Sequence, residues 1–342
     1  MRTRRIAFAS VLAACAVAVP AAPAMAGGDV NVMTRNIYLG ADIIGLAGDK
    51  PLADFKAEAS EMWKTVEATN FPKRAPALAK EIKSARPDLI GLQEATVWRT
   101  GKVGEGAKSV RYDFIKELIA ALKKQKMEYV LVVKQKEFDF EAPTTTQDVR
   151  ITMYDAILRR KSGSKVKVTG KSSGNYDASL AIPTAVGTAT VKRGWVAADA
   201  TVGGSKFRFV NTHLEAYGAA IRAQQATQLT SAGGPLANAG RTSILLGDLN
   251  SGPTSAAPDG YPVIADAGFS SVWGSKTDIR TFGRNELLTA QGDDSFIDHI
   301  MYRPSSRFSV RSKKVIGNSP FQSRAPRWSS DHNGVIAKLK IK

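Results

Sequence analysis

Short apolar runs that end in polar residues recur along this chain. Residues 88–92, 207–210 and 243–246 are rich in β-forming side chains, and each run leads directly into polar residues. A short apolar run bounded by turn-forming residues is typical of a buried strand, and groups at the ends of such strands can converge. The pattern therefore predicts a sheet edge that gathers polar side chains.

Two later motifs are arranged differently. Asp298 lies inside the apolar run 296–301, and Asp331 precedes the predicted strand 335–341. Residues 161–188 are rich in Gly, Ser and Lys and predict a loop with short edge strands.

Two helices are predicted between the strands. Residues 75–85 place Leu78 and Ile82 on one face and end before a proline, whereas residues 112–124 carry apolar side chains at every fourth position after the first-turn acid Asp113. Strands that alternate with helices predict a mixed α/β fold.

Residues 1–26 have the features of a signal peptide. Three arginines precede the apolar stretch 6–22, and small residues at 24–26 form a cleavage site. We therefore expect a secreted protein whose residues 27–342 form one domain, since no linker or repeat divides them. The segment around Cys15 also resembles a lipoprotein cleavage box, so a lipid anchor is the less favoured alternative.

Composition limits the chemistry of the exported domain. Cys15 is the single cysteine and is removed with the signal, which excludes disulfides, a cysteine nucleophile and thiolate zinc sites. The formal charge of +17 falls to +14 without the three signal arginines. This charge favours polyanions such as nucleic acid, an anionic membrane or phosphorylated small molecules, although it also serves solubility alone.

Three histidines occur in the chain, and each lies near an acid or an Asn. They are His213 near Asn211, His299 next to Asp298, and His332 next to Asp331. Histidine titrates near neutral pH and commonly moves protons in enzymes. This clustering indicates an enzyme.

Six polar motifs follow one another along the chain. They are Met33-Thr34-Arg35-Asn36, Leu92-Gln93-Glu94, Asn211-Thr212-His213-Leu214, Gly247-Asp248-Leu249-Asn250, Ile297-Asp298-His299 and Ser330-Asp331-His332. The ordered set resembles the endonuclease/exonuclease/phosphatase superfamily, also called the DNase I-like fold, over residues 30–340. Residues 36–42 look most similar to secreted bacterial members.

The resemblance implies a four-layer α/β sandwich, in which two packed mixed β-sheets are flanked by helices and the site lies at one end. It also implies a hydrolase of phosphate esters that depends on Mg²⁺ or Mn²⁺. Such hydrolysis needs an activated water, a cation on the non-bridging oxygens and a proton for the leaving group. A hard cation held by few carboxylates is usual for Mg²⁺.

Transferred residue by residue, the resemblance makes Glu94 the metal ligand, helped by Asn36 and supported by Asp331. His332 is then the base that activates water, and Asp298 holds it in the required tautomer.

The remaining roles concern the phosphate and the leaving group. The resemblance implies that Asp248 and Asn250 position the nucleophile and bind a phosphate oxygen. His213, with Asn211 beside it, would protonate or stabilise the leaving oxygen. Asp248 and Asn250 also lie in a turn-forming stretch, and Asn211 could instead satisfy backbone groups.

Three further positions qualify this assignment. Because neighbouring strand residues face opposite sides, His299 should point away from the side that Asp298 faces, which favours a structural role. Some nuclease members carry a second metal-site carboxylate two residues after the first-motif Asn, where this chain has Tyr38. The next acid is Asp42, whose role stays open.

The sequence leaves several substrates open. Export and charge favour an extracellular nuclease acting on DNA or RNA. The alternatives are a sphingomyelinase-like or other lipid or small-molecule phosphodiesterase, an inositol-phosphate phosphatase and, from another class, a non-catalytic module that binds polyanions. Lipid-cleaving members need an exposed apolar element, and Phe269, Trp273 and Phe282 could form one or could belong to core strands. We expect a monomer without an obligate protein partner.

Overall fold

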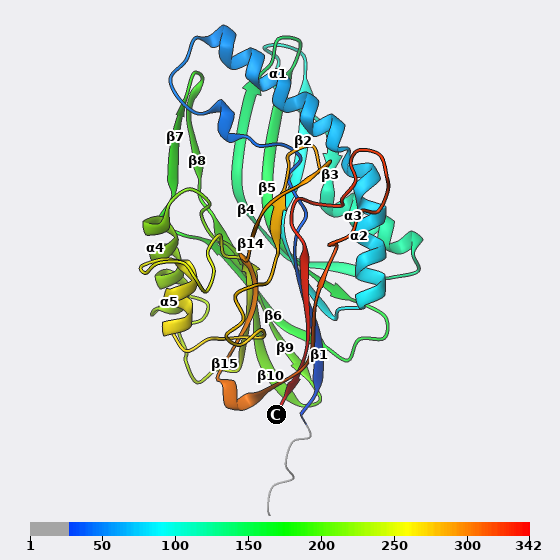
Figure 1. Cartoon of the computed structure of the whole chain (residues 1–342), viewed down its shortest axis with the longest axis vertical. Helices are drawn as coiled ribbons and strands as arrows, with labels where there is room; N and C mark the ends of the chain where they lie inside the picture. The colour runs from blue at the N-terminus through cyan, green and yellow to red at the C-terminus, as the bar shows by residue number, and fades with distance from the viewer. Residues whose placement is uncertain (1–26) are drawn as a thin grey trace, which may run out of the picture.

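Two large β-sheets pack face to face in the computed structural model, which describes residues 27–342 (Figure 1). The predicted signal peptide therefore lies outside the described residues. The first sheet has the strand order β16–β17–β1–β2–β5–β4, with β3 also paired to β2. Its strands are β1 (Asp29–Asn36), β2 (Leu89–Gly101), β3 (Ser109–Asp113), β4 (Tyr129–Pro143), β5 (Asp148–Arg160), β16 (Phe308–Ile316) and β17 (Gly334–Ile341).

The second sheet has the order β12–β15–β11–β10–β9–β6. Its strands are β6 (Lys167–Asn175), β9 (Gly194–Val202), β10 (Ser205–His213), β11 (Ser243–Asp248), β12 (Ser270–Ser271) and β15 (Asp298–Arg303). Both sheets are mixed, because β1 and β2 run parallel, as do β10 and β11, among otherwise antiparallel neighbours. Two hairpins stand apart, namely β7 (Leu180–Thr184) with β8 (Gly187–Val191), and β13 (Phe282–Arg284) with β14 (Gln291–Ser295).

Helices cover the outer face of each sheet (Figure 1). The first sheet carries α1 (Leu52–Thr69), α2 (Phe71–Ala85) and α3 (Phe114–Lys124), and the second carries α4 (Ala219–Thr230) and α5 (Gly260–Asp266). Two short 3-10 helices, η1 (Ile44–Leu46) and η2 (Ser305–Arg307), lie in connections. The predicted four-layer α/β sandwich is confirmed. Among residues 27–342, no helix has the length and apolar character to cross a membrane.

Side-chain alternation along the strands divides the apolar residues among three layers of core. On β11, Ile244 and Leu246 face the other sheet, whereas Leu245 packs under the helices of its own side. On β10, Phe209 and Val210 divide in the same way. This period of two is what places a fixed set of residues between the sheets.

The face between the sheets changes character along its length. On β1, Val30 and Val32 belong to the apolar core between the sheets, and the next two residues of the same face are the buried polar side chains Thr34 and Asn36. The strands β1, β10, β11 and β15 bring their polar ends to the same edge, which is where the site forms, and β2 adds Glu94 from within its length.

The helix boundaries differ from the predicted ones. The helix predicted for residues 112–124 begins at Phe114, because Asp113 is its N-cap and accepts a bond from the backbone N–H of Lys116 at 3.1 Å. The helix predicted for residues 75–85 begins one turn earlier, after the N-cap Asn70. The 18-residue helix α1 was not predicted.

The three aromatic residues that could have formed a membrane element belong to the interior. Phe269 is buried in the core under α5, and Trp273 packs against the core between the sheets. The ring of Phe282 lies 4.7 Å from that of His332, centroid to centroid. These residues therefore provide no exposed apolar patch.

Gly91 lies where the two sheets approach each other closely, so a substitution there tests their packing. A Cβ at this position would lie 2.2 Å from Leu246 Cδ1 and 2.4 Å from Asn211 Oδ1 of the opposite sheet. We predict that Gly91→Ala lowers the free energy of unfolding by about 1–3 kcal/mol, because the added methyl overpacks the interface. Gly45→Ala is the matched control, since nothing lies within 4 Å of a Cβ there. Equal urea midpoints for the two variants would contradict this packing.

Candidate active site

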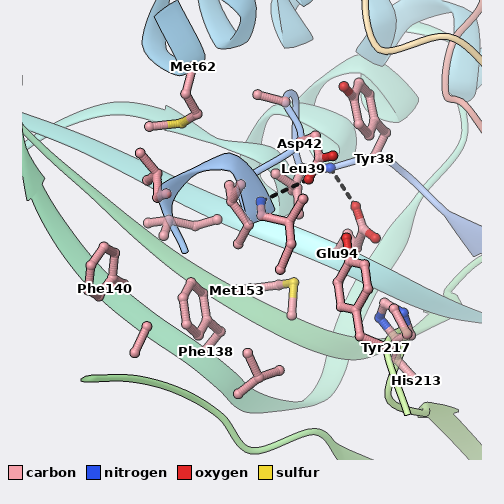
Figure 2. Close-up of a pocket in the computed structure, with 18 of the residues that line it drawn as sticks. Tyr38, Leu39, Asp42, Met62, Glu94, Phe138, Phe140, Met153, His213 and Tyr217 are labelled. Atoms are coloured by element: carbon pink, nitrogen blue, oxygen red, sulfur yellow. Dashed lines mark hydrogen bonds between the residues drawn. The ribbon is translucent and has the colours of Figure 1, made fainter. Parts of the chain in front are cut away.

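A pocket opens where the polar ends of the strands meet (Figure 2). Most of the predicted site residues are brought together at it, although they come from segments far apart in sequence. Those that line the pocket are Glu94, His213, Asp248, Asn250, Asp331 and His332. Asn36 and Asp298 are fully buried directly behind them and contact this group.

His332 and Asp298 form the shortest contact between ionisable groups of the pocket. His332 Nδ1 lies 2.8 Å from Asp298 Oδ2, and the backbone N–H of Asp298 donates to Thr281 Oγ1 at 3.0 Å. Burial alone lowers the pKa of His332, but the charges of Asp298, Asp331 and Asp248 outweigh it and raise the pKa to about 10. The bond to Asp298 leaves Nε2 of the ring facing Asp248, at 3.6 Å from its Oδ2.

Asp248 lies between the two histidines of the pocket. Its Oδ2 is 3.4 Å from His213 Nε2 and accepts a bond from Asn36 Nδ2 at 3.1 Å, while its Oδ1 accepts the backbone N–H of Asn250 at 2.9 Å. Burial and the charge of Asp298 raise the pKa of Asp248 to about 7. Its protonation thus changes near neutral pH, as suits a group that shares protons with its neighbours.

Glu94 reaches the pocket because β2 is irregular at this point. The pairing of β2 with β5 shifts between Leu92 and Ala95, and Glu94 has the left-handed φ of 57°. A bulge re-aims a side chain that regular alternation would turn away from the site. Glu94 Oε1 accepts from Asn36 Nδ2 at 3.0 Å, and its Oε2 accepts from the backbone N–H of Leu39 at 2.8 Å.

Backbone strain is concentrated at the site. Besides Glu94, the non-glycine residues Tyr38 and Asn250 have positive φ values of 60° and 47°. Such conformations cost free energy and persist only where surrounding contacts enforce them. Tyr38 donates its backbone N–H to Asn36 Oδ1 at 3.0 Å, and Asn250 Nδ2 donates to the carbonyl of Leu214 at 3.0 Å.

Glu94 and Asp331 are suited to hold a hard divalent cation together with Asn36. Burial and the charge of Glu94 raise the pKa of Asp331 to about 6, although His332 opposes the shift. A cation beside Asp331 would relieve the unfavourable effect of the Glu94 charge on it, and oxygen donors are what Mg²⁺ and Mn²⁺ prefer. The residues present therefore fit the implied metal.

His213 lies in a different electrostatic setting from His332. Arg193 Nη1 lies 2.9 Å from its Nδ1, and Asn250 Nδ2 lies 3.1 Å from its Nε2. Burial and the positive charges of Arg193 and His332 hold the pKa of His213 well below its usual range. The two pocket histidines therefore differ, with His213 neutral and His332 the more basic.

Asn211 and His299 lie away from the pocket. Asn211 Nδ2 donates to the carbonyl of Leu92 at 3.0 Å and its Oδ1 accepts from Gln93 Nε2 at 2.5 Å, so it bridges the two sheets. These contacts favour the alternative role of Asn211, which is to satisfy buried polar groups, and its catalytic role stays a prediction. His299 faces the opposite side of β15, where its Nε2 lies 3.0 Å from the carbonyl of Ser251.

Three buried arginines that the sequence did not reveal hold the loop at 329–333. Arg35 and Arg284 both donate to the carbonyl of His332, at 2.7 and 2.9 Å, and Arg74 donates to the carbonyl of Ser329 at 2.9 Å. Burial lowers the pKa values of Arg74 and Arg284 to about 10, so both remain charged at neutral pH. In the sequence, the one sign of these buried arginines was Arg35, a charged residue within an apolar strand run.

Asp42, whose role was open, orders the turn that leads into η1. Its Oδ1 accepts the backbone N–H of Ile44, at 2.9 Å, and its own N–H donates to Glu286 Oε1 at 2.8 Å. It thereby orders the segment that forms one wall of the pocket.

The pocket extends from the polar group into an apolar groove, which the sequence did not predict. The cavity has a volume of about 330 Å³. Its apolar walls come from the segment before and through η1, from α1, from β4 and β5, and from the β7–β8 hairpin, and include Leu39, Leu46, Met62, Phe138, Phe140, Ile151, Met153, Ile182 and Val191 (Figure 2). No single segment carries the groove, so no sequence pattern marks it.

Comparison with known proteins places this geometry in context. The model of the Endonuclease/Exonuclease/phosphatase family matches residues 36–332. No curated protein matches the chain. Similar solved structures include a family protein from Bacteroides thetaiotaomicron (17% identity, 92% of this chain and 99% of that chain, TM-score 0.58). A mannosyl-6-phosphatase from the same species is also similar, with 18% identity, coverage of 91% of this chain and 99% of that chain, and a TM-score of 0.52. D. rerio TDP2 complexed with a single-strand DNA product has 16% identity, coverage of 91% of this chain and 98% of that chain, and a TM-score of 0.53.

The histidines offer a direct test of the site. We predict that His332→Ala and His213→Ala each lower kcat for a small chromogenic phosphodiester by about 10²–10⁴-fold, the usual contribution of a placed acid or base. His299→Ala is the control on the opposite face of β15 and should cost far less. If a folded His299→Ala protein is as inactive as His332→Ala, the reacting groups lie elsewhere.

Proposed function

Because the chain belongs to the endonuclease/exonuclease/phosphatase family, we propose that it is a metal-dependent phosphodiesterase whose substrate carries an apolar chain, as a phospholipid does. The apolar groove that continues from the histidines and carboxylates of the pocket is the observation that supports this substrate class. A pocket lined mainly by apolar side chains, with a few polar groups at one end, orients an amphiphilic ligand by its chemistry.

The pocket residues divide the work of hydrolysis between them. His332, with Asp298 on its Nδ1 side, is the base that accepts a proton from the attacking water at Nε2, and it does so from its neutral form. A divalent ion at the neighbouring carboxylates would offset the negative charges that raise the pKa of His332 and so would favour that neutral form. Asp248 and Asn250 orient the water and a phosphate oxygen. Glu94, Asn36 and Asp331 would hold a divalent ion, which would supply positive charge for the phosphate oxygens.

The leaving oxygen develops negative charge on the other side of the phosphate. Burial and Arg193 lower the pKa of His213 and keep its ring neutral. A neutral imidazole is a weak acid but a good hydrogen-bond donor, so we assign His213 to stabilising the leaving oxygen through a hydrogen bond from Nε2.

A nuclease is the second candidate. The net charge of the chain and the similarity to a TDP2 structure that holds single-strand DNA both support it. However, part of the basic stretches is used within the fold. Arg160 is buried with its Nη2 2.5 Å from Asp88 Oδ1, and Arg303 donates to the carbonyl of Ala267 at 2.7 Å. The exposed lysines of β6 and β16 remain as a track for a nucleic-acid backbone.

We also propose that the protein is exported and acts outside the cell, on the basis of the signal-like residues 1–26. An exported enzyme of this kind would meet both the phospholipids of surrounding membranes and free nucleic acid, which are the substrates of the two candidate functions.

Chelation tests the metal. We predict that excess EDTA abolishes turnover of a small chromogenic phosphodiester and that added Mg²⁺ or Mn²⁺ restores it, because Glu94 and Asp331 lose the cation that balances them. Glu94→Gln should remain inactive at any Mg²⁺ concentration tried, and circular dichroism should show an unchanged fold. Full activity in excess chelator would exclude the role given to Glu94.

The groove is tested by substitution within one hairpin. Ile182 lines the groove, whereas Val186, in the β7–β8 turn, is exposed and outside it. We predict that Ile182→Gln raises KM for a long-chain phosphodiester by about tenfold or more, the usual cost of lost apolar contact, and leaves a short-chain analogue unchanged. Val186→Gln should change neither.

A substrate panel separates the candidates. The purified chain with Mg²⁺ is given sphingomyelin, a glycerophospholipid, plasmid DNA, RNA, inositol phosphates and a sugar phosphate side by side. Rapid, salt-sensitive cleavage of DNA or RNA beside intact lipid would establish the nuclease instead. Release of inorganic phosphate from monoesters would indicate a phosphatase. Polyanion binding without any hydrolysis would indicate a non-catalytic module.

A further inference from the structure

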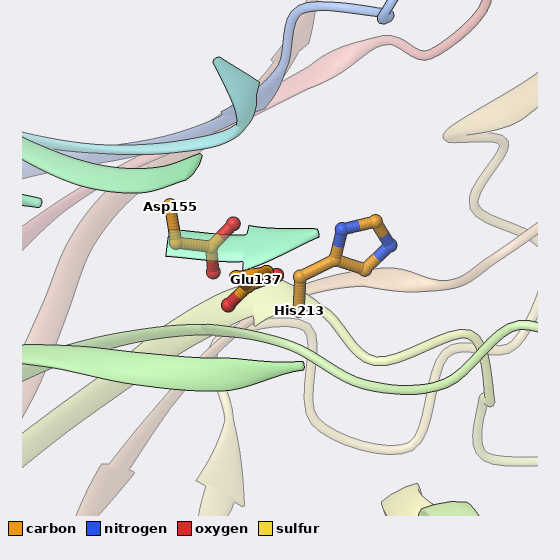
Figure 3. Close-up of side chains that lie close together, drawn as sticks. All are labelled: Glu137, Asp155 and His213. Carbon is orange, nitrogen blue, oxygen red and sulfur yellow. The ribbon is translucent and has the colours of Figure 1, made fainter. Parts of the chain in front are cut away.

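Behind His213, on the side away from the open pocket, lie two carboxyl groups that the catalytic assignment does not use. They belong to Glu137 on β4 and Asp155 on β5 (Figure 3). Glu137, Asp155 and His213 are 1%, 0% and 2% exposed. Each offers one ligand atom, and these atoms all lie within 4.8 Å of one another.

None of the carboxylate oxygens of this pair is satisfied. Within residues 27–342, both oxygens of Glu137 and both oxygens of Asp155 are buried without a hydrogen-bond partner. Burial raises the pKa of Glu137 to about 8 and that of Asp155 well above its usual range. Burying a carboxylate without a donor or a cation is so costly that native proteins nearly always pair it.

The charges nearby leave a deficit of positive charge. Arg193 is the buried cation next to the cluster, and its Nε already lies 3.5 Å from Glu215 Oε2. Three carboxylates, those of Glu137, Asp155 and Glu215, therefore face one guanidinium. Their formal sum is −2 when all are ionised, which is the charge that one divalent cation balances.

We propose that Glu137, Asp155 and His213 bind a divalent transition-metal ion of the Mn²⁺ or Zn²⁺ type, at a structural site distinct from the one at Glu94. Metal–ligand bonds of about 2.0–2.2 Å place three ligand atoms of one ion about 3–3.6 Å apart, so the side chains of the cluster would draw closer together on binding. Two carboxylates and one imidazole suit such ions, whereas Mg²⁺ keeps several waters and loses them reluctantly.

Ion binding at this cluster would also orient the catalytic histidine. His213 Nε2 faces Asp248 and Asn250, at 3.4 and 3.1 Å, so an ion would bind at Nδ1 and displace Arg193 Nη1, which lies 2.9 Å from that atom. Ligation at Nδ1 fixes the tautomer in which Nε2 carries the proton, the form that can donate a hydrogen bond to a leaving oxygen. Arg193 would then lose its contact with Nδ1 and keep its ion pair with Glu215.

A shared proton is the rival explanation of the same pair. One proton between Glu137 and Asp155 would satisfy one oxygen of each carboxyl group. It would leave the other two oxygens without a donor and the local charge at −1. A divalent ion bound through one oxygen of each group engages the same number of oxygens, but it also balances the remaining charge.

Metal content tests the proposal independently of the reaction. The purified chain is dialysed briefly against EDTA, which strips an accessible ion, and retained metals are counted by inductively coupled plasma mass spectrometry. We expect one buried Mn²⁺ or Zn²⁺ ion per chain to remain. Protein unfolded and refolded in chelator should melt at a lower temperature, and the added ion should restore the midpoint.

Matched variants locate the ion. Glu137→Gln and Asp155→Asn should lose the retained ion and its thermal stabilisation, whereas Glu94→Gln should keep both and lose only the Mg²⁺-dependent activity. The proposal is overturned if the wild-type chain neither retains nor takes up an ion, or if Glu94→Gln alone releases it. The first result would support the shared proton. Because the wild-type measurement stands alone, misfolding of a variant does not blur the outcome.

Discussion

The face between the two sheets imposes the constraint on which the rest of the structure depends. Each central strand presents apolar side chains to this face over most of its length and polar ones at the same end. On β11 the inward sequence runs Ile244, Leu246, Asp248, and on β10 Phe209 is followed by Asn211 and His213. The alternation that builds the core thus also delivers the reactive groups, and a shift of one residue would send them to the opposite face.

Concentrating so many ionisable groups in a buried place requires that they stabilise one another. His332 is held between Asp298 and Asp248, and buried arginines fix its loop through backbone carbonyls rather than through carboxylates. Those arginines position the loop through its backbone carbonyls, and the side-chain oxygens of the pocket carboxylates stay available to a metal. The left-handed conformations of Glu94 and Asn250 show that the fold maintains local strain where a side chain must be aimed.

The sequence predicted the layers and most of the pocket, because alternation and strand-end polarity are local signals. The same local signals could not separate the two roles open to Asn211: it shares a face with His213 but lies two residues deeper, and only the opposite strand shows what it contacts. The helix α1 carries Phe55, Ala59 and Val66 at helical spacing and could have been recognised. The groove and the Glu137–Asp155 pair could not, because they arise from contacts between distant segments.

The central claim is that hydrolysis at the histidines is coupled to binding of an apolar chain in the groove. It is tested most directly by kcat/KM for a series of phosphodiesters that differ only in alkyl chain length. Burial of each added methylene is worth about 0.8 kcal/mol, so kcat/KM should rise about fourfold per methylene until the groove is filled. Rates that do not depend on chain length would contradict the account.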